Sequence, residues 1–82
     1  MMEELGKVTH YYPKIGVAIV ELKAPLKVGD KIQIKGRKTD FEQIVESIQI
    51  EHKNVQSAES GKFIGLKVIQ KVKEGDLIYA VK

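Results

Sequence analysis

A seven-residue phrase that occurs twice constrains the fold of this chain more than any other feature. Residues 26–32 read Leu-Lys-Val-Gly-Asp-Lys-Ile, and residues 72–78 read Val-Lys-Glu-Gly-Asp-Leu-Ile. Gly-Asp favours a tight turn, because glycine tolerates positive φ and the aspartate side chain accepts hydrogen bonds from nearby backbone. Each copy runs directly into a strand-like segment. The repeat therefore predicts two equivalent turns, each followed by a β-strand, at Gly29, Asp30, Gly75 and Asp76.

Short apolar runs separated by glycine and proline predict the strands. They cover residues 7–12, 16–22, 31–35, 41–51, 63–69 and 77–81. Residues 16–22 are apolar at both alternating sets of positions, which is typical of a strand that is covered on both faces or closes a barrel. Six short strands with no convincing helix indicate a small all-β barrel or sandwich.

The segment 41–51 admits two interpretations. Its apolar residues fit the helical period of 3.6 as well as a strand, but Ile48-Gln49-Ile50 continues in β-type alternation, which favours the strand. The apolar residues Val45 and Ile48 are three positions apart, whereas the residues facing one side of a strand are two apart. One extra residue, a β-bulge near Glu46-Ser47, would let both side chains face inward. Residues 55–61 are predicted to be a connector.

The length of 82 residues allows one domain, so residues 1–82 are predicted to form a single unit with residues 1–4 frayed. The alternation within the strands predicts the side chains of the core. They are Ile19, Ile32, Ile34, Ile48, Ile64, Leu66, Val68 and Ile78.

Composition narrows the class of protein. The absence of cysteine excludes disulfides and thiolate metal sites. No apolar run reaches the roughly 20 residues of a membrane helix, and the acidic start Met-Met-Glu-Glu is not a signal peptide, so we expect a cytoplasmic protein without membrane contact. A net charge of +3 permits an anionic partner. Because Arg37 is the only arginine, contact with a phosphate backbone is favoured over reading of bases.

Catalytic groups are sparse in this sequence. The three serines lack the Gly-x-Ser-x-Gly setting of a nucleophile elbow. His10 and His52 could share a metal only if their strands were neighbours, with Glu51 as the nearest third ligand. We therefore expect no enzyme activity, no catalytic residue, no metal site and no cofactor.

Two segments are candidates for binding RNA or another partner. Residues 10–14 offer flat tyrosine rings, and the loop at residues 35–38 offers clustered positive charge. A bland alternative exists for each: one tyrosine covers the end of the barrel while the other is merely exposed, and the basic loop is simply solvated. If RNA binds, the two segments should form one surface. The candidate residues are Tyr11, Tyr12, Lys14, Lys35, Arg37 and Lys38.

The order of these signals resembles domain 2 of elongation-factor-Tu-type translation GTPases. The likeness lies in residues 6–8, 16–20, 26–32, 45–48, 65–68 and 75–78, with Val55, Ala58 and Gly61 between them. The resemblance implies a closed six-stranded β-barrel of the translation-protein type. A P-loop sequence is absent, so neither a GTPase domain nor a nucleotide cofactor is expected.

The chain is also similar to the C-terminal barrel of U32-family peptidase-like proteins, through Thr-Asp-Phe at 39–41 and Val-Glu-Ser-Ile-Gln at 45–49. In size it resembles stand-alone translation-elongation-factor-like proteins. These resemblances imply a non-catalytic module that binds tRNA, rRNA or a protein of the translation or tRNA-modification machinery. The alternative is a protein-interaction subunit, a detached U32-type barrel that acts in trans with an enzyme.

Overall fold

The computed structural model describes residues 3–81, which form strands and turns with no helix among them. The strands are β1 (Glu3–Tyr12), β2 (Val17–Leu22), β3 (Leu26–Lys27), β4 (Lys31–Lys35), β5 (Asp40–Ile44), β6 (Ile48–Ile50), β7 (Lys53–Val55), β8 (Ser57–Ala58), β9 (Phe63–Lys67) and β10 (Leu77–Ala80). Eight of them pair in the order β5-β4-β10-β1-β2-β9-β6-β7, and β3 pairs with β8. The all-β prediction is confirmed. None of these elements is a helix long and apolar enough to cross a membrane.

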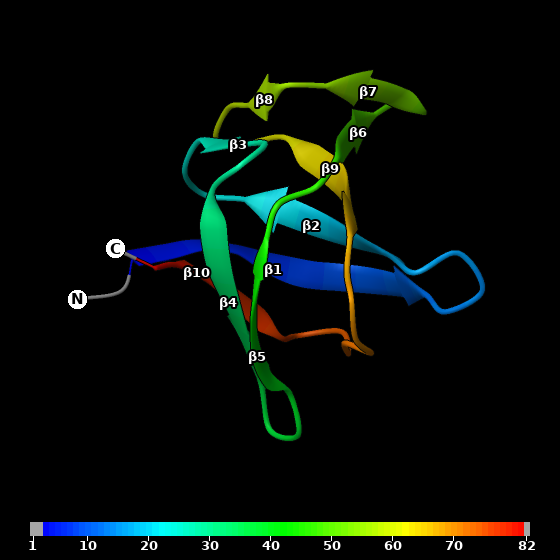
Figure 1. Ribbon diagram of the computed structural model, residues 1–82, viewed down its shortest axis with the longest axis vertical. Coiled ribbons are helices and arrows are strands. Elements are labelled where there is room, and N and C mark those ends of the chain that lie inside the picture. The colour runs from blue at the N-terminus through cyan, green and yellow to red at the C-terminus, as the bar shows by residue number, and fades with distance from the viewer. Residues whose placement is uncertain (1–2, 82) are drawn as a thin grey trace.

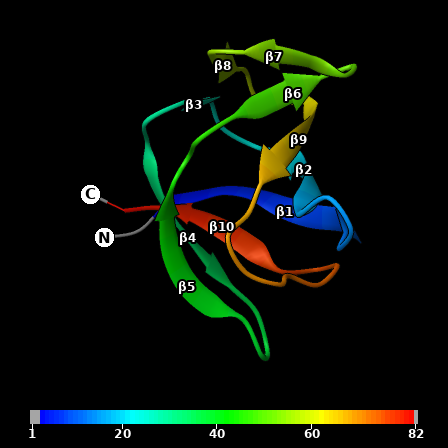
Figure 2. The same ribbon diagram turned by 45° about the vertical axis from the view of Figure 1, so that its right-hand side comes forward.

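The main sheet curls around the core without closing into a barrel (Figures 1 and 2). Its two edges are β5 and β7. The predicted closed six-stranded barrel is therefore wrong both in strand number and in closure. The extra strands are the two- and three-residue elements β3, β7 and β8, which are too short to give a recognisable alternation in the sequence.

The predicted strand 41–51 is divided into β5 and β6, and the bulge expected near Glu46-Ser47 is a break between them. At the end of β5, the Val45 N–H donates to the Asp30 carbonyl at 2.8 Å and its carbonyl accepts from the Gly29 N–H at 2.9 Å, so Val45 continues the pairing of β5 with β4 into the first Gly-Asp turn. From Ile48 the chain pairs with β9 instead, so the break marks a change of partner strand. The helical alternative for this segment is wrong as well.

A glutamine side chain spans the gap beside the β5 edge. Gln43 Nε2 donates to the carbonyl of Lys67 at 2.9 Å, and Gln43 Oε1 accepts from the N–H of Ile69 at 3.0 Å. The Gln43 side chain belongs to β5 and is buried, while its partners lie at the end of β9 and just beyond it. One amide thus makes the two hydrogen bonds that a neighbouring strand would have made.

The core prediction is confirmed for seven of its eight residues, which are all buried. Ile19 is the exception, since it is only partly buried. The pleat of β2 turns Ala18, Val20 and Leu22 inward, so that Ile19 and Val17 face outward. Because residues 16–22 are apolar at both alternating sets of positions, the sequence did not decide which set faces the core.

The two Gly-Asp turns have the same geometry. Gly29 and Gly75 have φ values of +98° and +94°. In each turn the Asp side chain accepts from the backbone N–H three residues earlier, at 3.1 Å for Asp30 and 2.8 Å for Asp76. The glycine N–H donates to Val45 in the first turn and to Val8, at 2.8 Å, in the second. The repeated phrase therefore builds the same turn twice.

We predict that Gly29→Val destabilises the fold by about 1 kcal/mol or more, because positive φ strains a β-branched residue. The space beside Gly29 is open, so a steric clash would not contribute. Urea unfolding of the variant measures this cost. An unchanged free energy of unfolding would show that the turn does not depend on glycine.

Strand β1 begins inside the segment that the sequence predicted to be frayed. Residues 1–4 were expected to fray, but Glu3 and Glu4 pair with Ala80 and Tyr79 of β10. Residues 1 and 2 lie outside the described residues. Register shifts in β1, between Glu4 and Gly6 and between Val8 and His10, bend this long central strand.

Candidate functional site

The outer face of β2 and β9 carries an apolar groove. Because β2 is apolar on both faces, its inward residues enter the core while Val17 and Ile19 remain half-buried on the outside. Ile19 lies opposite Gly65 of β9, and Gly65 in turn lies opposite Gln49 of β6. The missing side chain at Gly65 leaves a hollow between these strands.

One side of the groove is formed by the hairpin turn between β6 and β7. Ile50 pairs with Lys53, so Glu51 and His52 form a two-residue loop. Both have positive φ, 51° and 66°, as a type I′ turn requires. Asn-Gly is the usual sequence there, and non-glycine residues pay strain of about 1–3 kcal/mol in such conformations. The strained turn places Glu51 and His52 beside the groove.

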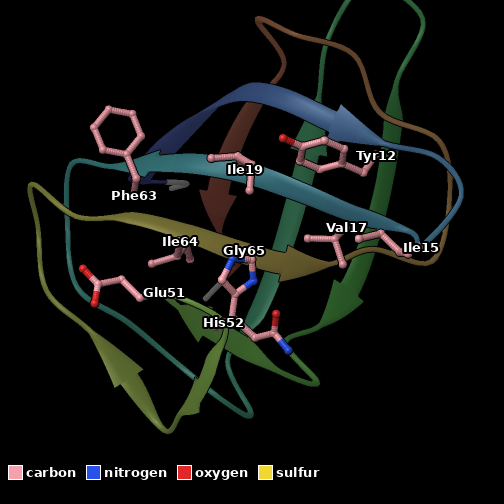
Figure 3. A pocket seen from close by; sticks show the side chains of 10 residues that line it. Tyr12, Ile15, Val17, Ile19, Glu51, His52, Phe63, Ile64 and Gly65 are labelled. Atoms are coloured by element: carbon pink, nitrogen blue, oxygen red, sulfur yellow. The ribbon is translucent and has the colours of Figure 1, made fainter.

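The ends of the groove are exposed apolar side chains. Figure 3 shows Phe63 at one end, Tyr12, Ile15 and Val17 at the other, and His52 beside Gly65. Phe63 is 57% exposed, Ile15 60% and Tyr12 45%. The hollow has a volume of about 270 Å³. The complete lining, which we call the apolar groove, is Tyr12, Ile15, Val17, Ile19, Gln49, Glu51, His52, Phe63, Ile64 and Gly65.

A second hollow lies between the β4–β5 loop and the second Gly-Asp turn. The loop is tight, because Gly36 N–H donates to the Thr39 carbonyl at 2.7 Å and Thr39 is buried. A Cβ at Gly36 would overlap the Asp76 carboxylate, so only glycine lets the loop lie against the turn. This basic hollow, of about 430 Å³, is lined by Gly36, Arg37, Lys38, Lys73, Glu74, Gly75 and Asp76.

The charges of the basic hollow are partly compensated. Three cations, Arg37, Lys38 and Lys73, face two carboxylates. Asp76 is buried and accepts from the Lys73 N–H. Glu74 is exposed and pairs with His10, 3.2 Å from Nδ1 to Oε2. The remaining positive charge is therefore carried by exposed side chains at the mouth.

The structure divides the predicted binding residues among four places. Arg37 and Lys38 line the basic hollow, whereas Lys35 lies on β4 outside its lining. Tyr12 and Lys14 lie at the exposed tip of the β1–β2 hairpin. Tyr11 is partly buried against the core.

His10 connects the hairpin with the basic hollow. Its ring packs edge-on against Tyr12, with ring centroids 4.5 Å apart, and it also pairs with Glu74 of the hollow. Tyr12 is thus linked to Arg37 and Lys38 through His10 and Glu74. Sequence reasoning did not identify this link or Lys73.

No binding role was predicted for the apolar residues of the groove other than Tyr12. The signal was present in the two apolar faces of residues 16–22, since one face fills the core and the other needs a second cover. Phe63, an exposed aromatic residue on β9, was a weaker signal.

No cluster of three metal-ligating side chains occurs within residues 3–81. His10 pairs with Glu74, while His52 borders the apolar groove. The pKa of Lys23 is raised, chiefly because its ammonium group donates to the Glu4 carboxylate at 2.6 Å. Neither Lys23 nor Glu4 lines the groove or the basic hollow.

Comparison with known proteins relates this chain to one family. The profile of the Peptidase family U32 C-terminal domain matches residues 3–78. An uncharacterized protease of Methanocaldococcus jannaschii is 44% identical over 80 residues, which are 96% of this chain and 20% of that protein. A collagenase of Porphyromonas gingivalis is 36% identical over 77 residues, 92% of this chain and 21% of that protein. The chain thus spans about a fifth of the length of these relatives.

Solved structures show the same fold. The C-terminal domain of a putative U32 peptidase of Geobacillus thermoleovorans superposes with a TM-score of 0.91 at 23% identity, over 98% of this chain and 93% of that one. Its selenomethionine variant gives 0.88 at 24% identity, over 93% and 96% of the two chains. The predicted U32 resemblance is confirmed, and the likeness to EF-Tu domain 2 stays a prediction. The chain belongs to the family of U32 peptidase C-terminal domains.

Proposed function

We propose that this domain is a non-catalytic docking module that binds the remaining part of a U32-family protein, in the same polypeptide or in a separate one. The observation that carries the proposal is the outward face of β2. Val17 and Ile19 are apolar, only half-buried, and bordered by exposed Phe63 and Ile15. Apolar surface gathered in a hollow is typical of a surface that another protein covers.

The family relation supports the choice of occupant. Relatives named as a protease and as collagenases carry this domain as about a fifth of their length, so a much larger protein body accompanies it there. An apolar groove suits a permanent contact with such a body, because obligate interfaces are more apolar than transient ones.

The non-catalytic role is part of the proposal. In the described part of the chain, His10 and His52 lie in separate places, and the buried carboxylate of Asp76 holds a turn. Any peptidase activity would then belong to the partner. The sequence-based partners, tRNA, rRNA and proteins of translation or tRNA modification, stay predictions.

We predict that Phe63→Gln and Ile15→Gln each weaken binding to the partner at least tenfold while leaving the fold intact. Truncating an apolar side chain that anchors an interface costs about 2 kcal/mol or more, and both side chains are mostly exposed in this chain and so available to a partner. The partner for calorimetric titration is the M. jannaschii relative without the fifth that matches this domain.

The matched control is Ile44→Gln. Ile44 is 50% exposed but lies on β5 and does not line the groove. It should leave the affinity unchanged. Equal losses for Ile15 and Ile44, or no binding by the parent chain, would contradict the docking proposal.

A further inference from the structure

We propose that the basic hollow, together with the His10–Tyr12 ring pair, binds single-stranded nucleic acid: the hollow takes backbone phosphates and the rings take a base. This surface is separate from the proposed protein contact, except that Tyr12 borders both.

Hydrogen bonds hold the backbone of the two turns that carry the cations of the hollow. The loop that carries Arg37 and Lys38 is closed by the Gly36–Thr39 hydrogen bond and lies directly against the Asp76 turn. Lys73 approaches from the other side of the hollow. Three cationic side chains on two neighbouring, hydrogen-bonded turns suit a phosphate, which accepts hydrogen bonds from several directions.

The neighbouring rings favour a nucleic acid over other anions. His10 and Tyr12 are exposed and pack edge-on at 4.5 Å, and His10 reaches the hollow through Glu74. Proteins that bind single strands combine a positive track with aromatic rings on which bases stack. An acidic protein segment or free phosphate would make no use of the rings.

Substitution of Glu74 tests the proposal through a gain in affinity, which a damaged fold would not produce. Its carboxylate lies at the hollow beside three cations and would compete with a phosphate for them. Removing its charge should strengthen binding, whereas a variant with a damaged fold should weaken it. The proposal therefore requires that the affinity rises when the charge of Glu74 is removed and falls when the charges of Arg37 and Lys38, in the same hollow, are removed.

The experiment is fluorescence anisotropy of a labelled twelve-nucleotide RNA of mixed sequence with the full 82-residue chain. In 50 mM salt we expect saturable binding. The double variant Arg37→Ala/Lys38→Ala should bind about tenfold more weakly or worse, with a salt slope lower by about two ions. Tyr12→Ala should lose about tenfold through lost stacking. Glu74→Gln should bind severalfold more tightly.

Lys62→Ala is the matched control, because it removes one exposed positive charge outside the basic hollow. It should change the affinity by no more than about twofold. Circular dichroism of every variant verifies the fold. Absence of binding by the parent chain, equal losses at Lys62 and at Arg37/Lys38, or weaker binding by Glu74→Gln would overturn the proposal.

Competition separates the possible sources of the anion. Inorganic phosphate at the same concentration of phosphate groups should displace little RNA. A poly-glutamate peptide of matched charge should also displace little. Full displacement by phosphate would reduce the hollow to a small-anion site. Full displacement by the peptide would assign it to an acidic protein. Either result overturns the nucleic-acid proposal.

Discussion

Leu66→Ala should destabilise the domain by about 2–5 kcal/mol, because the cavity it leaves cannot close. Leu66 is fully buried and lies on β9 between Ala18 of β2 and Ile48 of β6. Ala18 is too small to fill the space. Since domains of this size have only about 5–15 kcal/mol of stability, urea unfolding should show a large shift of the midpoint.

The control for Leu66 is Phe63→Ala on the same strand. Phe63 faces outward and is 57% exposed, so its loss should change the free energy of unfolding by about 0.5 kcal/mol or less. Similar costs at the two positions would mean that the inward and outward faces of β9 are assigned wrongly.

Gln43→Met should destabilise the fold by about 1–3 kcal/mol, although it keeps the side-chain volume. The change removes a buried donor and a buried acceptor, and it leaves the Lys67 carbonyl and the Ile69 N–H without their partner. Hydrogen exchange at the Ile69 amide should accelerate, while the Gly29 amide, bonded to Val45, keeps its protection.

Gln49→Met is the matched control for Gln43. Its Nε2 donates to Asn54 Oδ1 at 3.2 Å in an exposed pair, so water replaces the lost bond at little cost. If Gln43→Met were as stable as Gln49→Met, the curled sheet would not depend on the glutamine bridge.

Local chemistry explains what the sequence could predict. The turns at Gly29 and Gly75 follow from residues within four positions, and β4 alternates so cleanly that its predicted range, 31–35, is the observed one. The break after Val45 could not be predicted, because it marks a change of partner strand, from β4 for β5 to the distant β9 for β6. The same holds for Gln43, whose partners are more than twenty residues away.

The candidate surfaces also combine residues that local sequence identifies with residues that only long-range contacts bring in. Arg37 and Lys38 were identified from their local charge, but Lys73 and Glu74 join them only through the contact between loop and turn. The two apolar faces of β2 indicated that a second apolar surface exists. Which alternating set of residues faces inward is decided by the fold, and it places Ile19 in the groove rather than in the core. Residue types mark the apolar and basic segments, but the direction of each side chain is set by the pleat and by long-range contacts.

The most direct test of the docking function is a transverse-relaxation-optimised NMR titration of the ¹⁵N-labelled domain with the partner fragment of the M. jannaschii relative. We expect the largest shifts at amides of the apolar groove, led by Val17, His52 and Gly65. Amides of the basic hollow, such as those of Lys38 and Gly75, should change little. Shifts centred on the basic hollow, or no shifts at saturating partner, would contradict the account.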